Sequence, residues 1–545
     1  MNFPPQRRWN RETAWVVGLA ACASVAAVLV YFRHGDILLY GDAVAHINIA
    51  RRVFDSRTPG LLQLGTVWLP LPHLLMIPFL VSNSMWRSGV GGSIPSMIAY
   101  GLGVVGIFRL VRGAMTWSGQ PESPARATAW FAAAIYGLNP NLLYLQATAM
   151  TESLYLALFI WAVVHLREFW ERTRENLEPG DAGAPRSLWK CRLCLAGACL
   201  TRYDGWFVAA VLAALAVLSA WRADNPRARR EVLMFVLSAA SVPCLWFAYN
   251  GIVYRNPLEF ANGPYSAKAI EQRTAVPGFP PHPGTGNLSV AASYFVKAGE
   301  FSIGEGNWQR AWLLLALLGS ALMAWRNRRM AALLLLWLPV PFYMLAVAYG
   351  GVPIFTPVWW PQSLYNIRYG VQLLPALAVF LAISAYYLVS FARSATAQPS
   401  LAVLSAMFVA GSYAGVWRAG PGCYREAWVN SRTRLQLEEQ LAQKLNELPP
   451  RSSFLMYLGE HVGALQHAGI PLHRAIHEGN HRVFKQPSDP EGLWERALAD
   501  PGQNADFVVA FEGDTVWQAV HTRNLPVVAT IAVPGQRTAT ILRAR

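Results

Sequence analysis

Long stretches with almost no charged residue constrain this chain more than any other feature of its sequence. Residues 13–32, 231–254 and 369–391 are apolar along nearly their whole length, and about 20 such residues form a helix that crosses a hydrocarbon layer of ~30 Å. Only 14% of the 545 residues are charged, whereas soluble proteins carry about a quarter. The sequence therefore predicts an α-helical integral membrane protein whose chain crosses the membrane several times.

The net charge of +15 comes from short arginine clusters between the apolar stretches. No basic run and no zinc-ligand spacing indicates binding to nucleic acid. Short basic loops are typical of the cytoplasmic side of membrane proteins. We therefore place on that side Arg109, Arg112, Arg393 and the arginines of residues 167–192, 222–230 and 326–329.

This placement predicts about eleven transmembrane helices, with the N-terminus in the cytoplasm and the C-terminus outside. The first apolar stretch lacks a small-residue cleavage site, so we expect a retained anchor and not a signal peptide. Residues 33–92 and 254–308 become external loops of a membrane domain that covers residues 1–419. Residues 68–81 have external flanks and contain prolines, which predicts a re-entrant or interfacial helix that does not cross.

The composition changes from about Gly420 onward. Residues 431–448 have the pattern of a charged amphipathic helix, and residues 453–458, 506–511 and 526–533 have the pattern of strands. We expect a small soluble α/β domain of residues 420–545 outside the membrane. It contains no phosphate-binding glycine motif and no nucleophile elbow, so we assign it no chemistry. Its polar residues 459–461 and 477–479 fall in expected loops, where plain solvation and acceptor recognition are both open.

The first external loop contains a carboxylate that suits general-base catalysis. Asp42 and His46 are one helical turn apart in an expected helix, and a carboxylate beside the membrane surface is a suitable base for an acceptor hydroxyl. The alternative is that Asp42 only caps this helix. The second external turn leads from Asn139 and Pro140 to Glu152, which complements the N-terminus of the next helix and lies on the same side as Asp42.

Two further segments place arginines near this side. Arg202 and Asp204 lie in a turn between two apolar segments, where ionisable groups mark either a functional site or an internal ion pair. Tyr365 precedes Arg368, which begins a late transmembrane segment. A guanidinium there suits a lipid-linked phosphate, and interfacial snorkelling is the alternative.

In their order, these elements resemble the GT-C superfamily of membrane glycosyltransferases, in particular protein O-mannosyltransferases and lipid A aminoarabinose transferases. The resemblance covers residues 1 to about 420. Its motifs are the loop acid Asp42, a proline-rich helix, the Asn-Pro turn before Glu152, the turn of residues 201–205, and the Arg-Tyr-x-x-x-Leu-Leu-Pro sequence that begins at Arg368.

The resemblance implies an inverting transfer of a sugar from a polyprenyl-phosphate carrier to a protein, lipid or glycan acceptor on the extracytoplasmic face. Asp42 and Glu152 become the catalytic candidates, and the substrate-binding candidates are His46, Arg202, Asp204, Tyr365 and Arg368. Many relatives have two adjacent acids where this chain has Gly41, Asp42 and Ala43. No metal ligand is therefore assigned; Glu152 either orients the acceptor or joins a divalent metal site.

Two alternatives differ in class from the enzyme. A lipid or sugar transporter, or flippase, performs no covalent chemistry, but it often has internal repeats and charges in mid-span, which this sequence lacks. A catalytically dead scaffold is the other alternative. We expect the enzyme, located in the bacterial inner (plasma) membrane, with the membrane lipid carrier as a partner and no nucleic acid.

Overall fold

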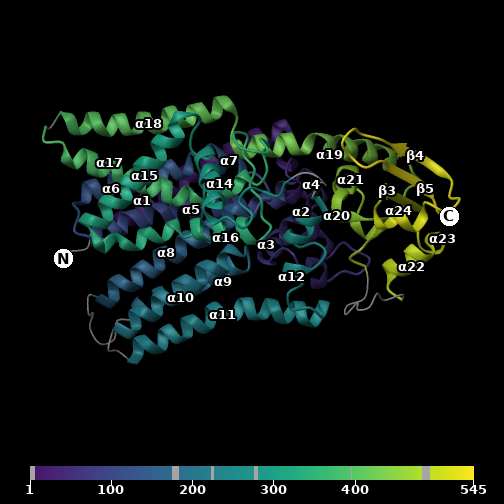
Figure 1. Cartoon of the computed structure of the whole chain (residues 1–545), viewed down its shortest axis with the longest axis horizontal. Helices are drawn as coiled ribbons and strands as arrows, with labels where there is room; N and C mark the ends of the chain where they lie inside the picture. The colour runs from purple at the N-terminus through teal and green to yellow at the C-terminus, as the bar shows by residue number, and fades with distance from the viewer. Residues whose placement is uncertain (1–5, 175–182, 223–225, 275–279, 395, 481–490) are drawn as a thin grey trace.

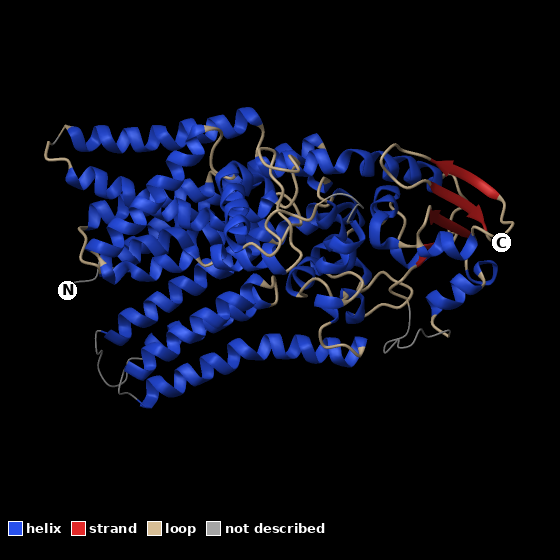
Figure 2. Ribbon diagram, viewed as in Figure 1, coloured by secondary structure: helices blue, strands red, loops and turns tan. Residues whose placement is uncertain are grey.

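The computed structural model describes residues 6–174, 183–222, 226–274, 280–394, 396–480 and 491–545. A large helical bundle occupies one end of the molecule and a small sheet lies at the other end, next to the C-terminus (Figures 1 and 2). This arrangement confirms the predicted fold class of a helical membrane protein with a small C-terminal α/β unit.

Seven segments of the described residues are long and apolar enough to cross a membrane. They lie in α1 (Gln6–His34), α5 (Val90–Trp117), α8 (Glu152–Arg174), α11 (Pro226–Tyr254), η3 with α16 (Arg328–Trp337 and Pro339–Tyr349), η4 with α17 (Ile367–Leu373 and Leu374–Phe391), and α18 (Ala397–Ala419), which leads into α19 (Gly422–Asn446).

Four more helices pack alongside these in the bundle (Figure 1). They are α6 (Glu122–Gly137), α9 (Gly183–Cys199), α10 (Asp204–Arg222) and α15 (Asn307–Arg326). Helix α6 contacts α5, α9 contacts α8, α10 contacts α11, and α15 contacts α17. These four helices lie where the sequence predicts further crossings, but among the described residues only the seven segments are long and apolar enough to cross, so the count of about eleven stays a prediction. Helices α9 and α10 meet at the turn expected near residues 201–205.

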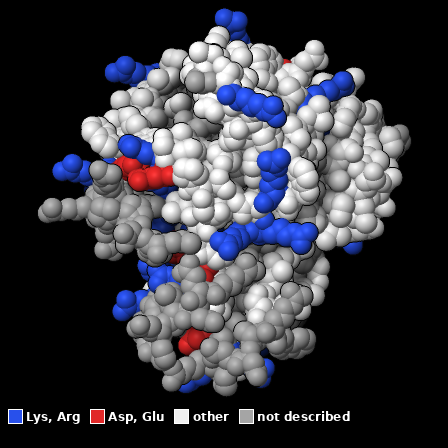
Figure 3. Space-filling view, turned by 90° about the vertical axis from the view of Figure 1, so that its left-hand side faces the viewer, with Lys and Arg blue, Asp and Glu red and all other residues white. Residues whose placement is uncertain are grey.

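Basic side chains gather on the end of the bundle that lies farthest from the sheet (Figure 3). The connections between α5 and α6 and between α17 and α18 lie at this end (Figure 1), as does the C-terminal end of α8. The sequence predicts that these connections are cytoplasmic, because short basic loops are retained on that side. Their location at one end is what this prediction requires, and the orientation in a membrane remains a prediction.

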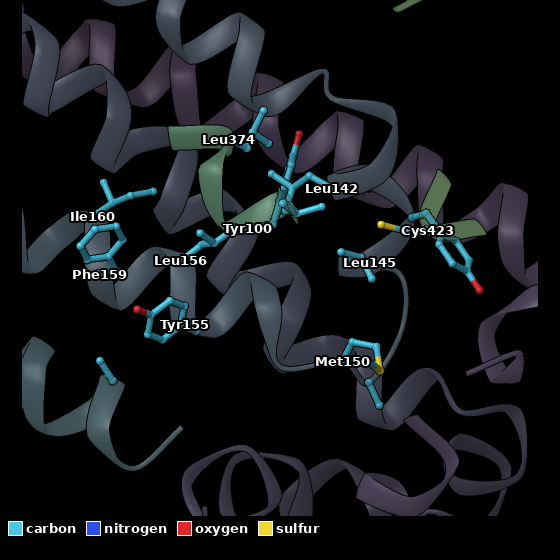
Figure 4. Close-up of a cluster of buried hydrophobic side chains, with 14 of the residues drawn as sticks. Tyr100, Leu142, Leu145, Met150, Tyr155, Leu156, Phe159, Ile160, Leu374 and Cys423 are labelled. Carbon is cyan, nitrogen blue, oxygen red and sulfur yellow. The ribbon is translucent and has the colours of Figure 1, made fainter. Parts of the chain in front are cut away.

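A packed core fixes the start of α8 in space. Leu142 and Leu145 of α7 (Pro140–Gln146), Tyr155 and Leu156 of α8, and Leu374 of α17 belong to one cluster of buried side chains (Figure 4). The Asn139 side chain caps α7 by accepting hydrogen bonds from two backbone N–H groups of its first turn. The acid at the start of α8 is therefore held by rigid surroundings.

The first external loop forms short helices that lie beside the bundle. They are η1 (Asp36–Leu38), α2 (Gly41–Arg52), η2 (Leu61–Leu64), α3 (Leu71–Leu80) and α4 (Asn83–Ser88). Helix α3 has 10 residues, which is half the length that a crossing needs. This length agrees with the prediction that residues 68–81 do not cross the membrane, and an interfacial or re-entrant position stays a prediction.

The second long external loop forms α12 (Glu259–Asn262), α13 (Ala267–Thr274) and α14 (Leu288–Phe301). Helix α14 packs so closely on η4 that a Cβ atom at Gly370 would lie 2.1 Å from the carbonyl carbon of Ala298. Only glycine fits there. This contact fixes the segment that carries Arg368.

The C-terminal sheet has the strand order β2-β1-β3-β5-β4. Strand β1 pairs in parallel with β2 and β3, whereas β5 pairs antiparallel with β3 and β4. The strands are β1 (Phe454–Met456), β2 (Ala475–Ile476), β3 (Phe507–Phe511), β4 (Val527–Ile531) and β5 (Ala539–Arg543). Short helices connect them: α20 (Leu458–His461), α21 (Gly463–Ala468), η5 (Leu472–Arg474), α22 (Leu493–Ala499), α23 (Pro501–Asn504) and α24 (Thr515–Val520). The three predicted strands are present as β1, β3 and β4, and the predicted amphipathic helix forms part of α19.

The C-terminal unit is bonded directly to helix α2. The carboxylate of Asp55, just beyond α2, accepts hydrogen bonds from the backbone N–H groups of Leu472 (3.2 Å) and His473 (3.1 Å). The Asn48 side chain donates to Gln466 at 2.7 Å. Since α2 also carries Asp42, the C-terminal unit helps to position that carboxylate.

Candidate active site

Six charged side chains from distant parts of the sequence form one connected network between the bundle and the external helices. We call it the charged cluster. Its members are Asp42 in α2, Glu152 at the start of α8, Arg202 and Asp204 around the start of α10, Arg368 in η4, and Glu426 in α19.

Arg368 lies at the centre of the charged cluster and contacts three carboxylates. Its Nη2 atom is 2.6 Å from Oδ2 of Asp42, its Nη1 atom is 2.9 Å from Oε1 of Glu426, and its Nε atom is 3.6 Å from Oε1 of Glu152. Glu426 also accepts the backbone N–H groups of Asn366 and Arg368, both at 3.2 Å. Arg368 is therefore held at both its backbone and its guanidinium group.

Arg202 joins the same network from the opposite side of Glu152. Its Nη1 atom lies 3.2 Å from Oε1 of Glu152, and its Nε atom lies 3.2 Å from Oδ2 of Asp204. The Tyr343 hydroxyl accepts from Arg202 at 2.9 Å and donates to Asp204 at 3.2 Å. The internal Arg202–Asp204 pair considered as an alternative is thus present, but it forms part of a larger network in which Glu152 bridges two guanidinium groups.

Exposure separates Asp42 from the other carboxylates of the charged cluster. Its side chain is 41% exposed, whereas those of Glu152, Asp204 and Glu426 are 0%, 3% and 2% exposed. A buried carboxylate with an arginine partner is costly to separate from it. Asp42 is therefore the member of the cluster whose carboxylate a substrate can reach.

The structure decides against the capping role considered for Asp42. Helix α2 has Tyr40 at its N-cap position and no side-chain hydrogen bond to its first turn. Asp42 is already inside the helix, and its carboxylate contacts Arg368 instead. The N-terminus of α2 still favours a negative charge at this position.

The charged cluster borders a cavity of about 1780 Å³, which Asp42, Arg368 and Tyr369 line directly. The other walls come from the first external loop, the loop before α14, the segment before η4, and the C-terminal unit. Tyr265, Lys268 and His282 of the second external loop also line this cavity. So do Gly459, Glu478 and Gly479 of the two polar loops noted in the C-terminal unit.

His46 does not line the cavity, although the sequence suggests it as a substrate-binding residue. It is buried, and its Nδ1 atom lies 2.9 Å from Nε2 of His73. Burial and the nearby Arg368 guanidinium lower the pKa of His46 to about 3, so the imidazole is neutral near pH 7. In this structure His46 fixes α2 against α3.

The remaining predicted residues divide between the cavity wall and the layer behind it. Tyr365 lines the cavity beside Arg368. Glu152, Arg202 and Asp204 lie behind the wall. Glu152 pairs with Arg368 of the wall, and Arg202 pairs with both Glu152 and Asp204.

The sequence analysis did not identify Glu426, Tyr343 or Arg52 as site residues. Glu426 belongs to a helix with an ordinary charged pattern, and Tyr343 lies in an apolar segment, so neither carries a local signal. Among the described residues, no group of three or more His, Cys, Asp or Glu side chains is placed to hold a metal ion.

No protein-family model and no curated protein sequence matches this chain. Several solved structures are similar to this chain. ArnT from Cupriavidus metallidurans in the apo state aligns over 97% of this chain and 98% of its own, at 13% identity and a TM-score of 0.55. The same protein bound to undecaprenyl phosphate gives a TM-score of 0.54 at 13% identity, with the same coverage. The chain has the GT-C fold.

The GT-C fold of this chain extends over its full described length, including the C-terminal unit, because the alignment with ArnT covers nearly all of both chains. An archaeal oligosaccharyltransferase from Archaeoglobus fulgidus aligns over 92% of this chain and 69% of its own, at 12% identity and a TM-score of 0.45. The alignment with ArnT confirms the resemblance noted from the sequence motifs at the level of the fold.

Proposed function

We propose that this chain is an inverting glycosyltransferase that moves a sugar from a polyprenyl-phosphate carrier to an acceptor hydroxyl on the extracytoplasmic face. The observation that carries the proposal is the Asp42–Arg368 contact of 2.6 Å on the wall of the cavity of about 1780 Å³. A base for the acceptor and a cation for the departing phosphate are thus adjacent. The shared fold with ArnT, which has been solved with undecaprenyl phosphate, supports a carrier of this class.

Asp42 is the general base in this mechanism. It removes the proton from the acceptor hydroxyl, and the resulting oxygen forms a bond with the anomeric carbon. The bond between that carbon and the phosphate oxygen breaks on the opposite face, so the configuration inverts and polyprenyl phosphate leaves with the electron pair. A phosphate is already a good leaving group, and the enzyme mainly has to position the reactants and stabilise the charge.

Arg368 is the residue that binds the carrier phosphate. A guanidinium donates two parallel hydrogen bonds to phosphate oxygens. When the phosphate occupies Nη2 of Arg368, it displaces the exposed Asp42 carboxylate and leaves Asp42 free to act as a base. The buried Glu426 and Glu152 keep the guanidinium in place during this exchange.

Arg202, Asp204 and Glu152 are positioning residues in this scheme, and Tyr365 contacts the substrate from the cavity wall. We place the N-terminus and the basic end of the bundle in the cytoplasm, and the cavity and C-terminal unit outside, in a bacterial inner membrane. The basic side chains at the opposite end of the bundle support this orientation (Figure 3).

The test uses the purified full chain in lipid nanodiscs, a set of synthetic polyprenyl-phosphate sugars, and an envelope extract as the source of acceptor. We expect free polyprenyl phosphate to be released only when the extract is present, together with a glycosylated product of inverted configuration. In proteoliposomes, movement of intact carrier across the bilayer with no cleavage under any acceptor would contradict transfer and favour a transporter.

A further inference from the structure

A second set of polar side chains, around Arg52, lines the same cavity at the C-terminal end of α2. Asp42, Ala45, Ile49 and Arg52 all border the cavity, because they lie on one side of the helix. Asp42 and Arg52 are ten positions apart, which corresponds to a rise of about 15 Å along a helix. The α2 helix is therefore a wall that connects the candidate catalytic carboxylate to a distant arginine.

Among the described residues, Arg52 does not find the hydrogen-bond partners that a buried arginine normally has. Its side chain is 15% exposed, and its buried Nε atom has no hydrogen-bond partner. Its Nη1 atom lies 3.7 Å from Oε1 of Glu478, which is too long for a hydrogen bond. Arginine has five N–H donors, and buried donors in native proteins nearly always have partners. Arg52 therefore lines the cavity with a guanidinium whose Nε atom has no partner among the described residues and whose contact with Glu478 is long.

Residues from two other segments lie close enough to Arg52 to interact with its charge. Glu478 and Tyr457 belong to the C-terminal unit, and Tyr265 belongs to the second external loop; all three line the cavity. The Tyr457 hydroxyl donates to the Tyr265 hydroxyl at 3.3 Å. One oxygen of Glu478 accepts the backbone N–H of Leu458 at 2.9 Å, and its other oxygen is the one nearest Arg52.

The chemistry of this group favours hydroxyls over anions. A hydroxyl both donates and accepts, so adjacent hydroxyls can accept from Arg52 and donate to the carboxylate of Glu478 together. A phosphate or carboxylate would pair with Arg52 but be repelled by Glu478. Adjacent hydroxyls on a rigid ring are the defining feature of a sugar, and the tyrosine rings add apolar surface for its carbon face.

We propose that Arg52, Glu478, Tyr457 and Tyr265 form a subsite that binds the hydroxyls of a glycan acceptor. The proposal rests on the proposed function, because the acceptor end to be glycosylated would lie at Asp42. The span of about 15 Å between Asp42 and Arg52 exceeds one sugar ring. The acceptor is therefore an oligosaccharide with several sugars, and the C-terminal unit selects it.

The test measures binding without any donor, using the full chain in nanodiscs and linear oligosaccharides of glucose, mannose and N-acetylglucosamine with one to six sugars. We expect one series to bind with an affinity that rises with length. Arg52→Gln and Glu478→Gln should each weaken binding roughly 10- to 100-fold. Tyr457→Phe serves as a milder variant, since it keeps the ring. Arg87→Gln is the matched control, because Arg87 touches the C-terminal unit through His467 but does not line the cavity.

Three outcomes would overturn the glycan subsite: no oligosaccharide binds, Arg52→Gln and Glu478→Gln bind as well as the wild type, or a phosphorylated lipid headgroup binds at Arg52 while the sugars do not. The proposed function is tested separately by the release of polyprenyl phosphate. A chain that binds glycans but never releases polyprenyl phosphate contradicts the transferase, whereas a transferase with an unchanged acceptor KM in Arg52→Gln contradicts only the subsite.

Discussion

The Nη2 atom of Arg368 and the Oδ2 atom of Asp42 lie 2.6 Å apart, although 326 positions separate these residues in the sequence. The two partners differ in exposure: the Arg368 side chain is 9% exposed and paired with Glu426, whereas the Asp42 side chain is 41% exposed. A ligand that competes for the guanidinium would therefore displace Asp42 and not Arg368. The pair can exchange a carboxylate for a phosphate without moving the buried part of the network.

Asp42→Asn should abolish transfer while leaving the fold and carrier binding nearly intact. Asparagine keeps the shape and one oxygen acceptor but cannot take a proton, and a positioned general base contributes about 10²- to 10⁴-fold to a rate. Turnover is measured as the release of polyprenyl phosphate, and carrier affinity by titration in nanodiscs. Asp36→Asn is the matched control, since Asp36 is a buried acid bonded to Tyr424 outside the cavity. Equal turnover in Asp42→Asn and the wild type would remove Asp42 from the mechanism.

Arg368→Lys should lower turnover more than it lowers carrier affinity. Lysine keeps the charge but loses the planar fork that contacts both Asp42 and Glu426. Because the phosphate charge grows as the glycosidic bond breaks, the lost hydrogen bonds matter most in the transition state. We expect a loss of roughly 100-fold in kcat and a change of only a few-fold in the carrier Kd. Equal losses in kcat and affinity would show that Arg368 only binds the carrier.

Glu152→Gln should reduce kcat by about 100-fold without removing any group that contacts substrate. The Oε1 atom of Glu152 lies between the guanidinium groups of Arg202 and Arg368, and its charge holds these two cations together. Without that charge Arg368 shifts from its position, and small misplacements are costly in rate. Glu300→Gln is the control, since Glu300 pairs with Lys297 outside the charged cluster.

The attachment of the C-terminal unit to α2 should weaken in acid through Asp55. Burial opposes the ionisation of Asp55, but hydrogen bonds from Arg51 and His473 outweigh it and lower the pKa of this carboxyl. A lowered folded pKa means that the stabilisation is complete above the ordinary value of about 3.9 and is lost as the pH falls through the folded pKa.

Asp55→Ala should therefore make the unit open more easily at pH 7, by about 3–5 kcal/mol, and this difference should shrink below about pH 4. Hydrogen exchange of strands β1 and β3 measures the opening free energy at each pH. Asp500→Ala is the control, because Asp500 is an exposed acid of the same unit that only caps α23. A difference independent of pH would exclude the carboxylate as its cause.

Cysteines placed on both flanks of residues 68–81 should react with an impermeant thiol reagent added outside intact cells. Arg57 and Ser84 are exposed positions on these flanks, and Arg328, exposed at the start of η3, should react only after permeabilisation. The background variant has the exposed Cys22 and Cys244 replaced by alanine. Labelling at position 84 only after permeabilisation would contradict both the re-entrant helix and the orientation.

Local patterns were sufficient to predict much of this fold. The apolar lengths predict the crossing helices, the short proline-containing segment predicts the 10-residue α3, and the alternating patterns predict β1, β3 and β4. Strands β2 and β5 were not predicted; β2 has only 2 residues, so it is defined by its partner β1 and not by its own pattern.

The sequence by itself determined which segments of the chain are external, because helix length and loop charge depend on neighbouring residues. This was enough to place four charged residues at one end of the bundle: Asp42, Glu152, Arg202 and Arg368. Only the tertiary structure decided which of these carboxylates a substrate can reach. It also decided that Glu426 joins Arg368, 58 positions away, and that Arg52 lies beside Glu478. Such contacts join residues far apart in the chain, and their energies depend on burial and distance, which no local pattern encodes.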